Sequence, residues 1–297
     1  DLLDALTQLG VDVCSQFENG CLPVIVRADG LKGGKTQLNG SKSSQFLTSL
    51  MLVAPCTERG MEIEITGELI SKPYIDITMS VMKAFGAHVI NEDYRYFRIA
   101  GGQRYQRREY AIEPDASNAS YFFAAAAVTG GRVRVNNLNM DSVQGDVHFV
   151  DVLERMGCQV NRYVDGIEVI GPEQLKGIDV DMNAISDTAL TLAAVAPFAD
   201  GKVIIRNIAH VRWQETDRIH AMVTELRKLG VTVVEHQDGV EISPSQITPA
   251  EIDTYRDHRV AMSFSLIGLK VPGIWIKDPG CVSKTFPNYF QVLETLR

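Results

Sequence analysis

The sequence lacks the patterns that mark several large classes of protein. Its longest apolar stretches, "YFFAAAAV" and "ALTLAAVAPF", have the length of buried helices and are too short to span a membrane. Its five cysteines are an odd number without a Cys-x-x-Cys pair, which predicts reduced thiols rather than disulfides or a zinc site. No HExxH, no GxGxxG and no spaced cluster of histidines or cysteines occurs. We therefore expect a cytoplasmic protein with no membrane segment, no metal and no nicotinamide cofactor.

Positive charge is scarce as well. The chain carries 29 Lys and Arg against 37 Asp and Glu, so its net charge is -8 and its pI is near 5.3. This balance argues against a nucleic-acid partner but permits a locally basic pocket for a small anion. The stretch "GLKGGKTQL" (30–38) is similar to a phosphate-binding loop, but that loop needs glycine where this chain has Asp29. We therefore reject a phosphate-binding loop there.

The sequence does contain an internal repeat. Four segments share the order amphipathic helix, turn glycine and short strand: "LLDALTQLGVDV", "ITMSVMKAFGAHV", "FVDVLERMGCQV" and "MVTELRKLGVTV". Their glycines, Gly10, Gly86, Gly157 and Gly230, are 76, 71 and 73 residues apart. A glycine after the last helical turn tolerates the left-handed conformation that ends many helices. Four such segments at a near-constant period indicate internal duplication.

Each repeat continues with a hairpin, for which Asp238-Gly239 is one predicted turn, and with a polar cluster before an apolar helix. Because these helices are apolar on most of their circumference, we expect them to be buried. The predicted fold class is α/β, in which each repeat has one surface helix, one buried helix and a small sheet. A chain of 297 residues has room for two domains, which we place at residues 1–113 and 114–297.

The polar clusters contain residues that cap helices well. They are Ser43, Ser44, Asp115, Ser117, Ser186, Asp187 and Asp257. Capping alone explains any single one of them. If the repeats are structurally equivalent, however, their helix N-termini lie at comparable positions. Each N-terminus then presents free N–H groups and a positive dipole end, which suit phosphate and carboxylate ligands.

The stretch "VRWQETDRIHAM" (211–222) adds charged residues at the start of another helix. Extending the apolar stripe of this helix backward leads to Arg218 and Glu215, so we expect both to face the core while Asp217 faces solvent. The alternative is an ordinary ion pair between Glu215 and Arg218.

Two further cations need an explanation other than capping. Arg259 follows His258 at the start of an apolar helix, where a buried arginine requires an acidic neighbour or an anionic ligand. Lys284 precedes a predicted helix with Pro287 in its first turn, and a lysine at that end opposes the helix dipole.

Six stretches, in order along essentially the whole chain, resemble the EPSP synthase (3-phosphoshikimate 1-carboxyvinyltransferase) family. They are "SSQFLTSL", "ISKPYIDITM", "DASNASYFFAAAA", "QETDRIHAM", "TYRDHRVAMSFSL" and "SKTFPNYF". The resemblance implies a two-domain enolpyruvyl transferase-like fold of six βαβαββ units, four of which match the repeat. It also implies a transferase of the shikimate pathway, and so of chorismate and aromatic amino-acid biosynthesis. Such enzymes transfer the enolpyruvyl group of phosphoenolpyruvate to the 5-hydroxyl of shikimate 3-phosphate and release phosphate.

The same resemblance assigns roles to individual residues. The implied catalytic residues are Asp187 as the base, with Glu215 and Lys284 as proton-transfer groups. The implied contacts to shikimate 3-phosphate are Ser43, Ser44, Gln45, Ser71, Tyr74, Asp187, His210 and Gln214. The implied contacts to phosphoenolpyruvate are Gln45, Arg218, His258, Arg259 and Lys284. Bidentate arginines suit carboxylate and phosphate geometry. The resemblance implies no cofactor, and we expect a monomer at full length.

The chain departs from the family pattern in two ways. His210 and Gln214 stand where the family form has Asn and Lys. The family also places a segment before the position of Asp1, with a "PGSKS"-type motif, a "GNAGT"-type loop and another arginine. From this we expect an incomplete N-terminal domain and negligible turnover by the 297-residue chain alone.

Two alternatives to this function stay open. One is a catalytically inactive fragment that serves as a binding or assembly module. The other is the related enolpyruvyl transferase that acts on UDP-N-acetylglucosamine, against which "SSQF", "SKPY" and "QETDR" argue.

Overall fold

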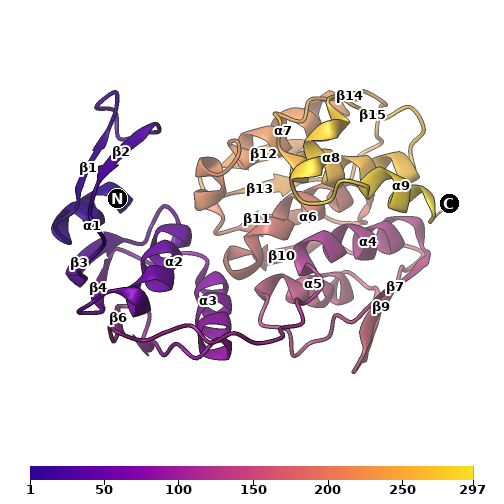
Figure 1. The fold of residues 1–297 in the computed structure, drawn as a ribbon. Helices are drawn as coiled ribbons and strands as arrows, with labels where there is room; N and C mark the ends of the chain where they lie inside the picture. Colours follow the sequence, from indigo (N-terminus) through magenta and orange to yellow (C-terminus); the bar gives the residue numbers. More distant parts are fainter. Residues whose placement is uncertain (297) are drawn as a thin grey trace. The chain divides into compact units, whose positions relative to one another are not determined.

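The computed structural model describes residues 1–296 and divides into two compact units, Asp1–Ala111 and Ile112–Arg297, drawn in Figure 1. Each unit has a hydrophobic core of its own, so each is described by itself. Within residues 1–296, no helix combines the length and the apolar character that crossing a bilayer requires.

The first unit is built on a four-stranded sheet with the order β3-β4-β6-β5. Its strands are β3 (Gly34–Asn39), β4 (Met61–Thr66), β5 (Ile90–Glu92) and β6 (Tyr96–Ile99). β3 and β4 are parallel and are connected through helix α2 (Ser44–Val53), while α3 (Lys72–Ala84) connects β4 to β5. β6 is antiparallel to both β4 and β5. This order is one complete βαβαββ unit.

Alternation along β4 gives this sheet one buried face. Met61, Ile63 and Ile65 are buried, whereas Glu64 between them is exposed. Helix α1 (Leu2–Gln8) packs on β3 and leads into the hairpin of β1 (Asp12–Ser15) and β2 (Val24–Arg27).

The second unit repeats this sheet topology. Its four-stranded sheet has the order β10-β11-β13-β12, and its strands have the same relative directions as those of the first unit. These strands are β10 (Ile178–Asp181), β11 (Val203–Arg206), β12 (Val233–His236) and β13 (Gly239–Ile242). The recurrence of one topology in two parts of the chain confirms the fold class that the repeat predicts.

The remaining strands of the second unit form two smaller sheets. An antiparallel sheet has the order β7-β9-β8, and β14 pairs with β15 in parallel. These strands are β7 (Arg132–Asn136), β8 (Gln159–Tyr163), β9 (Gly166–Ile170), β14 (Glu251–Ile252) and β15 (Trp275–Ile276). The outer helices are α5 (Phe149–Arg155), α7 (Arg218–Lys228) and α9 (Tyr289–Glu294).

Three apolar helices form the core of the second unit: α4 (Ala116–Thr129), α6 (Ala189–Val195) and α8 (His258–Ser265). Helix α6 packs against both α4 and α8 (Figure 1). Small side chains let these helices approach closely, and the buried hydroxyl of Thr191 lies 3.1 Å from that of Ser120 and 3.4 Å from that of Ser263. The predicted burial of these three helices is confirmed.

Helix α2 is the exception to this prediction. Its residues Leu47, Leu50 and Met51 are buried, but Leu52 and Val53 are 40% and 45% exposed. The helix therefore buries one face only, and it packs beside α3.

The repeat glycines behave as predicted. Gly10, Gly86, Gly157 and Gly230 follow α1, α3, α5 and α7 with φ values of +81°, +85°, +101° and +76°. The hairpin turn lies one residue earlier than predicted, because Gly239 already belongs to β13 and pairs with His236. A Cβ on Gly239 would lie 2.0 Å from the carbonyl oxygen of Ile205, so glycine is required there for close strand approach.

Candidate active site

Arg218, the first residue of α7, is the centre of a buried polar cluster in the second unit. Its side chain is only 2% exposed. Nε donates to Asp257 Oδ2 at 2.8 Å, Nη1 to Asp187 Oδ1 at 3.0 Å, and Nη2 to Glu215 Oε2 at 2.7 Å. Burial by itself would lower the pKa of Arg218, but the charges of Asp257 and Asp187 outweigh burial and raise this pKa. Three carboxylates therefore hold one charged guanidinium in the core.

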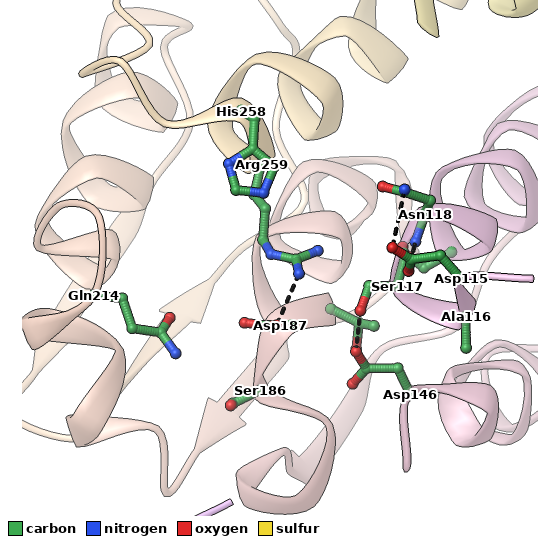
Figure 2. A network of polar contacts seen from close by, with 12 residues as sticks. Asp115, Ala116, Ser117, Asn118, Asp146, Ser186, Asp187, Gln214, His258 and Arg259 are labelled. Carbon is green, nitrogen blue, oxygen red and sulfur yellow. Dashed lines mark hydrogen bonds and ion pairs between the residues drawn. The ribbon is translucent and has the colours of Figure 1, made fainter. Parts of the chain in front are cut away.

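Asp187 connects this arginine to a second one. It lies in the 3-10 helix η3 (Asn183–Thr188), soon after β10, and its Oδ2 accepts a hydrogen bond from Arg259 Nη2 at 2.8 Å (Figure 2). Arg259 is 11% exposed and also lies 3.4 Å from the hydroxyl of Tyr121. The acidic neighbour that a buried arginine requires is thus Asp187, which comes from a different repeat. Asp187 does not cap a helix, so the capping alternative is wrong for this residue.

Asp257 caps α8 and also neutralises Arg218. Its Oδ1 accepts the backbone N–H of Arg259 at 2.8 Å, while its Oδ2 accepts from Arg218. The side chain of Asp257 is fully buried. The sequence predicts the cap because the capped residue, Arg259, follows two positions later in the chain. It does not predict the ion pair, because Arg218 lies 39 positions away in the chain.

His258 is buried beside this cluster without a hydrogen bond. Its side chain is 2% exposed, and neither ring nitrogen has a hydrogen-bond partner among residues 1–296. Nδ1 lies 3.4 Å from Asp257 Oδ1, but not in hydrogen-bonding geometry. Burial, assisted by the charge of Arg259, lowers the pKa of His258 to about 4. His258 is therefore a neutral imidazole at physiological pH.

Glu215 and Lys284 form a direct ion pair next to Arg218. The ammonium of Lys284, at the end of the 3-10 helix η7 (Pro279–Lys284), donates to Glu215 Oε1. Partial burial would raise the pKa of Glu215, but the charge of Arg218 and the hydrogen bond from Lys284 outweigh it and lower this pKa. Glu215 is therefore an ionised acceptor of the hydrogen bond from Lys284.

Two sequence-based details of this region are wrong. The helical stripe does not extend to Glu215, because Asp217 caps α7 by accepting the backbone N–H of His220 at 2.9 Å. Glu215 reaches Arg218 from the preceding turn instead. Pro287 is not in the first turn of α9, which begins two residues later at Tyr289, because a short turn separates η7 from this helix.

His210 and Gln214 both depart from the family pattern, and Gln214 contacts the cluster whereas His210 contacts Ser186, the residue before Asp187. His210 Nε2 lies 2.8 Å from Ser186 Oγ, and burial lowers the pKa of this histidine. Gln214 Oε1 accepts a hydrogen bond from Nη1 of Arg218. A lysine in place of Gln214 could not accept this bond and would add another cation to the cluster.

Ser117 and Asp115, both expected as caps of α4, differ in what they do. Asp115 caps the helix by accepting the backbone N–H of Asn118 at 2.9 Å. Ser117 instead donates its hydroxyl to Asp146, a buried carboxyl in the 3-10 helix η2 (Gly145–His148). The sequence analysis missed Asp146, because an isolated acidic residue after Gln-Gly carries no local signal of burial.

The first unit holds the other predicted substrate contacts at two helix starts. Ser43 caps α2 by accepting the backbone N–H of Gln45 at 3.2 Å, and Ser44 begins the helix. Ser71 precedes α3 in a left-handed conformation with φ of +52°, and Tyr74 lies in the first turn of α3. Such strain in a residue other than glycine is typical of functional positions.

One topological rule places the residues to which the family resemblance assigns substrate contacts or catalysis. Each helix or turn that carries them follows the carboxyl end of a strand in one of three parallel pairs: β3 and β4, β10 and β11, or β14 and β15. In the first unit, α2 and α3 both return antiparallel to these strands, so their N-termini lie at the same end of the sheet. In α/β sheets this end binds ligands.

Comparisons with known proteins agree with this arrangement. The family model described as EPSP synthase (3-phosphoshikimate 1-carboxyvinyltransferase) matches residues 1–293. A 3-phosphoshikimate 1-carboxyvinyltransferase from a Nostoc species is 53% identical over 98% of this chain and 68% of its own length. The enzyme of the same name from a Marinomonas species is 48% identical over 100% of this chain and 70% of its own length.

Two solved structures share the fold. EPSP synthase from Acinetobacter baumannii has a TM-score of 0.80 and 24% identity over 99% of this chain and 69% of its own chain. The enolpyruvyl transferase NikO from Streptomyces tendae has a TM-score of 0.75 and 17% identity over 99% and 70%. The family match over nearly the whole chain, together with relatives at about half identity, means that this chain belongs to the EPSP synthase family.

Proposed function

We propose that the cluster around Arg218 carries out the anion binding and proton transfers of a 3-phosphoshikimate 1-carboxyvinyltransferase. This family's reaction moves the enolpyruvyl group of phosphoenolpyruvate to the 5-hydroxyl of shikimate 3-phosphate. The observation that supports the proposal most is the arrangement of two buried arginines and one lysine against the carboxylates Asp187 and Glu215. A cluster of this kind offers cations to an anionic substrate and ionisable groups to its reacting atoms.

Arg218, Arg259 and Lys284 are the proposed phosphoenolpyruvate ligands. All three now donate to carboxylates of the protein itself. A substrate carboxylate or phosphate would compete for the same N–H groups, because guanidinium forks match both anions. Since a nearby cation favours the ionised form of a carboxylate, loss of these ion pairs would make Asp187 a stronger base. Substrate binding would then prepare the base for its reaction.

The proposed proton transfers use three side chains. When the 5-hydroxyl oxygen bonds to C2 of phosphoenolpyruvate, its proton passes to Asp187. Lys284 donates a proton to the C3 methylene, which becomes a methyl group. Phosphate then leaves from C2, and Glu215 removes a proton from C3 to restore the double bond. The lowered pKa of Glu215 and its contact with the Lys284 ammonium support this division between acceptor and donor.

Shikimate 3-phosphate is the proposed ligand of the helix starts in the first unit. The hydroxyl groups and backbone N–H groups at the starts of α2 and α3, near Ser43, Ser44, Gln45, Ser71 and Tyr74, suit a phosphate. His210 and Gln214 remain proposed contacts to shikimate 3-phosphate, as the family resemblance implies. We also propose that the protein works as a monomer in the cytoplasm.

The test is phosphate release by the complete gene product with two acceptors. We expect release from phosphoenolpyruvate to require shikimate 3-phosphate, and UDP-N-acetylglucosamine to give no release above background. Release with the nucleotide sugar alone would assign the chain to the other enolpyruvyl transferase. Binding of both substrates without release would favour an inactive binding module.

A further inference from the structure

Asp146 is a buried carboxyl group that the proposed mechanism does not use. Its residue is 6% exposed, and it lies in η2 beside the start of α4 (Figure 2). Its Oδ2 accepts a hydrogen bond from Ser117 Oγ. Its Oδ1 is buried and has no hydrogen-bond partner among residues 1–296. An ionised carboxylate with one buried oxygen unpaired is costly, which favours the neutral acid.

Among residues 1–296, the groups that face Asp146 do not include a cation that forms an ion pair with it. From α4 it faces Ser117 and the charge of Asp115, from η3 the charge of Asp187, and from α8 the charge of Arg259. The guanidinium of Arg259 is hydrogen-bonded to Asp187 rather than to Asp146. On its own element, His148 is exposed and pairs with Asp151 at 2.8 Å. Burial first and the charge of Asp187 second raise the pKa of Asp146 to about 7.

We propose that Asp146 is a positioning residue that stays neutral while Asp187 is ionised and releases its proton when Asp187 becomes protonated. This inference rests on the proposed role of Asp187 as the base. Transfer of the hydroxyl proton to Asp187 removes a negative charge near Asp146. Asp146 then gives its own proton to water, so that one proton enters the pair and one leaves it. Below about pH 7 the pair therefore keeps a single negative charge throughout the transfer, which avoids two ionised carboxylates near each other.

The first test measures stability against pH without any substrate. The folded-state pKa of Asp146 lies above its unfolded value, so the folded protein binds one more proton between these two values. Its contribution to stability is therefore complete below the unfolded pKa and is lost as pH rises to about 7. We compare wild type, Asp146→Asn and, as a control, Asp141→Asn, which alters an exposed carboxylate on the same loop.

We expect the unfolding equilibrium constant of wild type to rise by up to about tenfold per pH unit more than that of Asp146→Asn. This difference should extend from about pH 4 to about pH 7, and Asp141→Asn should follow wild type. Equal slopes in wild type and Asp146→Asn would overturn the inference. Because no substrate is present, this result is independent of the proposed function.

If Asp146→Asn fails to fold, infrared titration of wild type and of Ser117→Ala shows instead whether Asp146 is neutral. The wild-type protein should lose a protonated-carboxyl band with a midpoint near pH 7. The hydrogen bond from Ser117 lowers the pKa of Asp146, so Ser117→Ala should move this midpoint to higher pH. Absence of the band, or an unmoved midpoint, would contradict a neutral Asp146.

The link to the reaction is tested with the complete gene product. Asp146→Asn should leave KM for shikimate 3-phosphate unchanged but alter the pH dependence of kcat near pH 7. An unaltered kcat profile, alongside the stability difference above, would show a neutral acid that is not coupled to Asp187, and this outcome would overturn the coupling.

Discussion

At the scale of single residues, Arg218 shows how a charge is kept in the core. Its ion pairs with Asp257 and Asp187 are almost completely removed from water. The desolvation cost of such a group is offset only while its partners are present. Substituting one member therefore leaves the charges of the others buried and uncompensated. A substitution in such a buried cluster should thus destabilise the protein more than a substitution in a surface ion pair.

Arg218→Ala should destabilise the protein and weaken substrate binding. Removing the cation leaves Asp257 and Asp187 without their partner, so we expect a loss of about 3–5 kcal/mol in the free energy of unfolding. The KM for phosphoenolpyruvate should also rise in the complete gene product. Denaturant titration and steady-state kinetics measure these effects. The control is Arg206→Ala, which breaks an exposed pair with Asp179 and should change stability little. Equal effects of both substitutions would contradict the account.

The five cysteines differ in their exposure to reagents. Cys14, Cys21 and Cys56 are exposed, whereas Cys158 is buried and burial raises the pKa of its thiol to about 12. Because the thiolate is the reactive form, Cys158 should stay unmodified at pH 8 while the three exposed cysteines are alkylated. Mass spectrometry after iodoacetamide treatment checks this pattern. Modification of Cys158 as fast as Cys56 in the native protein would show that this core opens.

At the scale of elements, the candidate site consists of helix and turn residues that follow parallel strands. Local signals predict this part well: Ser43, Asp115 and Asp257 all cap helices in the structure. Pairing across repeats is different, because Arg259 and Asp187 are 72 positions apart and no local pattern connects them. The family resemblance supplied the grouping of these residues, and the structure shows which atoms they use.

Another buried carboxylate attaches α7 to the segment before α8. Glu225 is fully buried and accepts hydrogen bonds from the Tyr255 hydroxyl at 2.6 Å, the Asp253 backbone N–H at 3.1 Å and the Lys228 ammonium at 2.8 Å. Tyr255 and Arg256 both adopt left-handed backbone conformations, with φ of 55° and 59°. This network therefore holds a strained turn directly before Asp257.

Glu225→Gln should cost about 1–3 kcal/mol of stability, because buried donors lose a charged acceptor. Tyr255→Phe removes only one of these hydrogen bonds and should cost about 1 kcal/mol. Thermal and denaturant unfolding of both variants give the comparison. If Tyr255→Phe proved more damaging than Glu225→Gln, the carboxylate would not be the organising group of this turn.

At the scale of the whole molecule, duplication explains most of what the sequence predicts. The repeated glycines and the hydrophobic patterns predict the α/β class, and two sheets of equal topology confirm it. The same patterns do not predict where a repeat departs from the others. For example, the sheet β7-β9-β8 has three strands instead of four. In another repeat, the 3-10 helix η3 leads directly into α6. Asp146 belongs to this unpredicted part, since its burial depends on contacts between α4, η2 and η3.

We propose that Asp187 is the base of enolpyruvyl transfer, and the decisive experiment is the substitution Asp187→Asn in the complete gene product. The asparagine keeps the shape of the side chain, so shikimate 3-phosphate should bind with nearly unchanged Kd. Turnover should fall about 10²–10⁴-fold, the range expected for loss of a general base. If kcat and the affinity for shikimate 3-phosphate fell by equal factors, Asp187 would be a binding residue, and the account would be wrong at its centre.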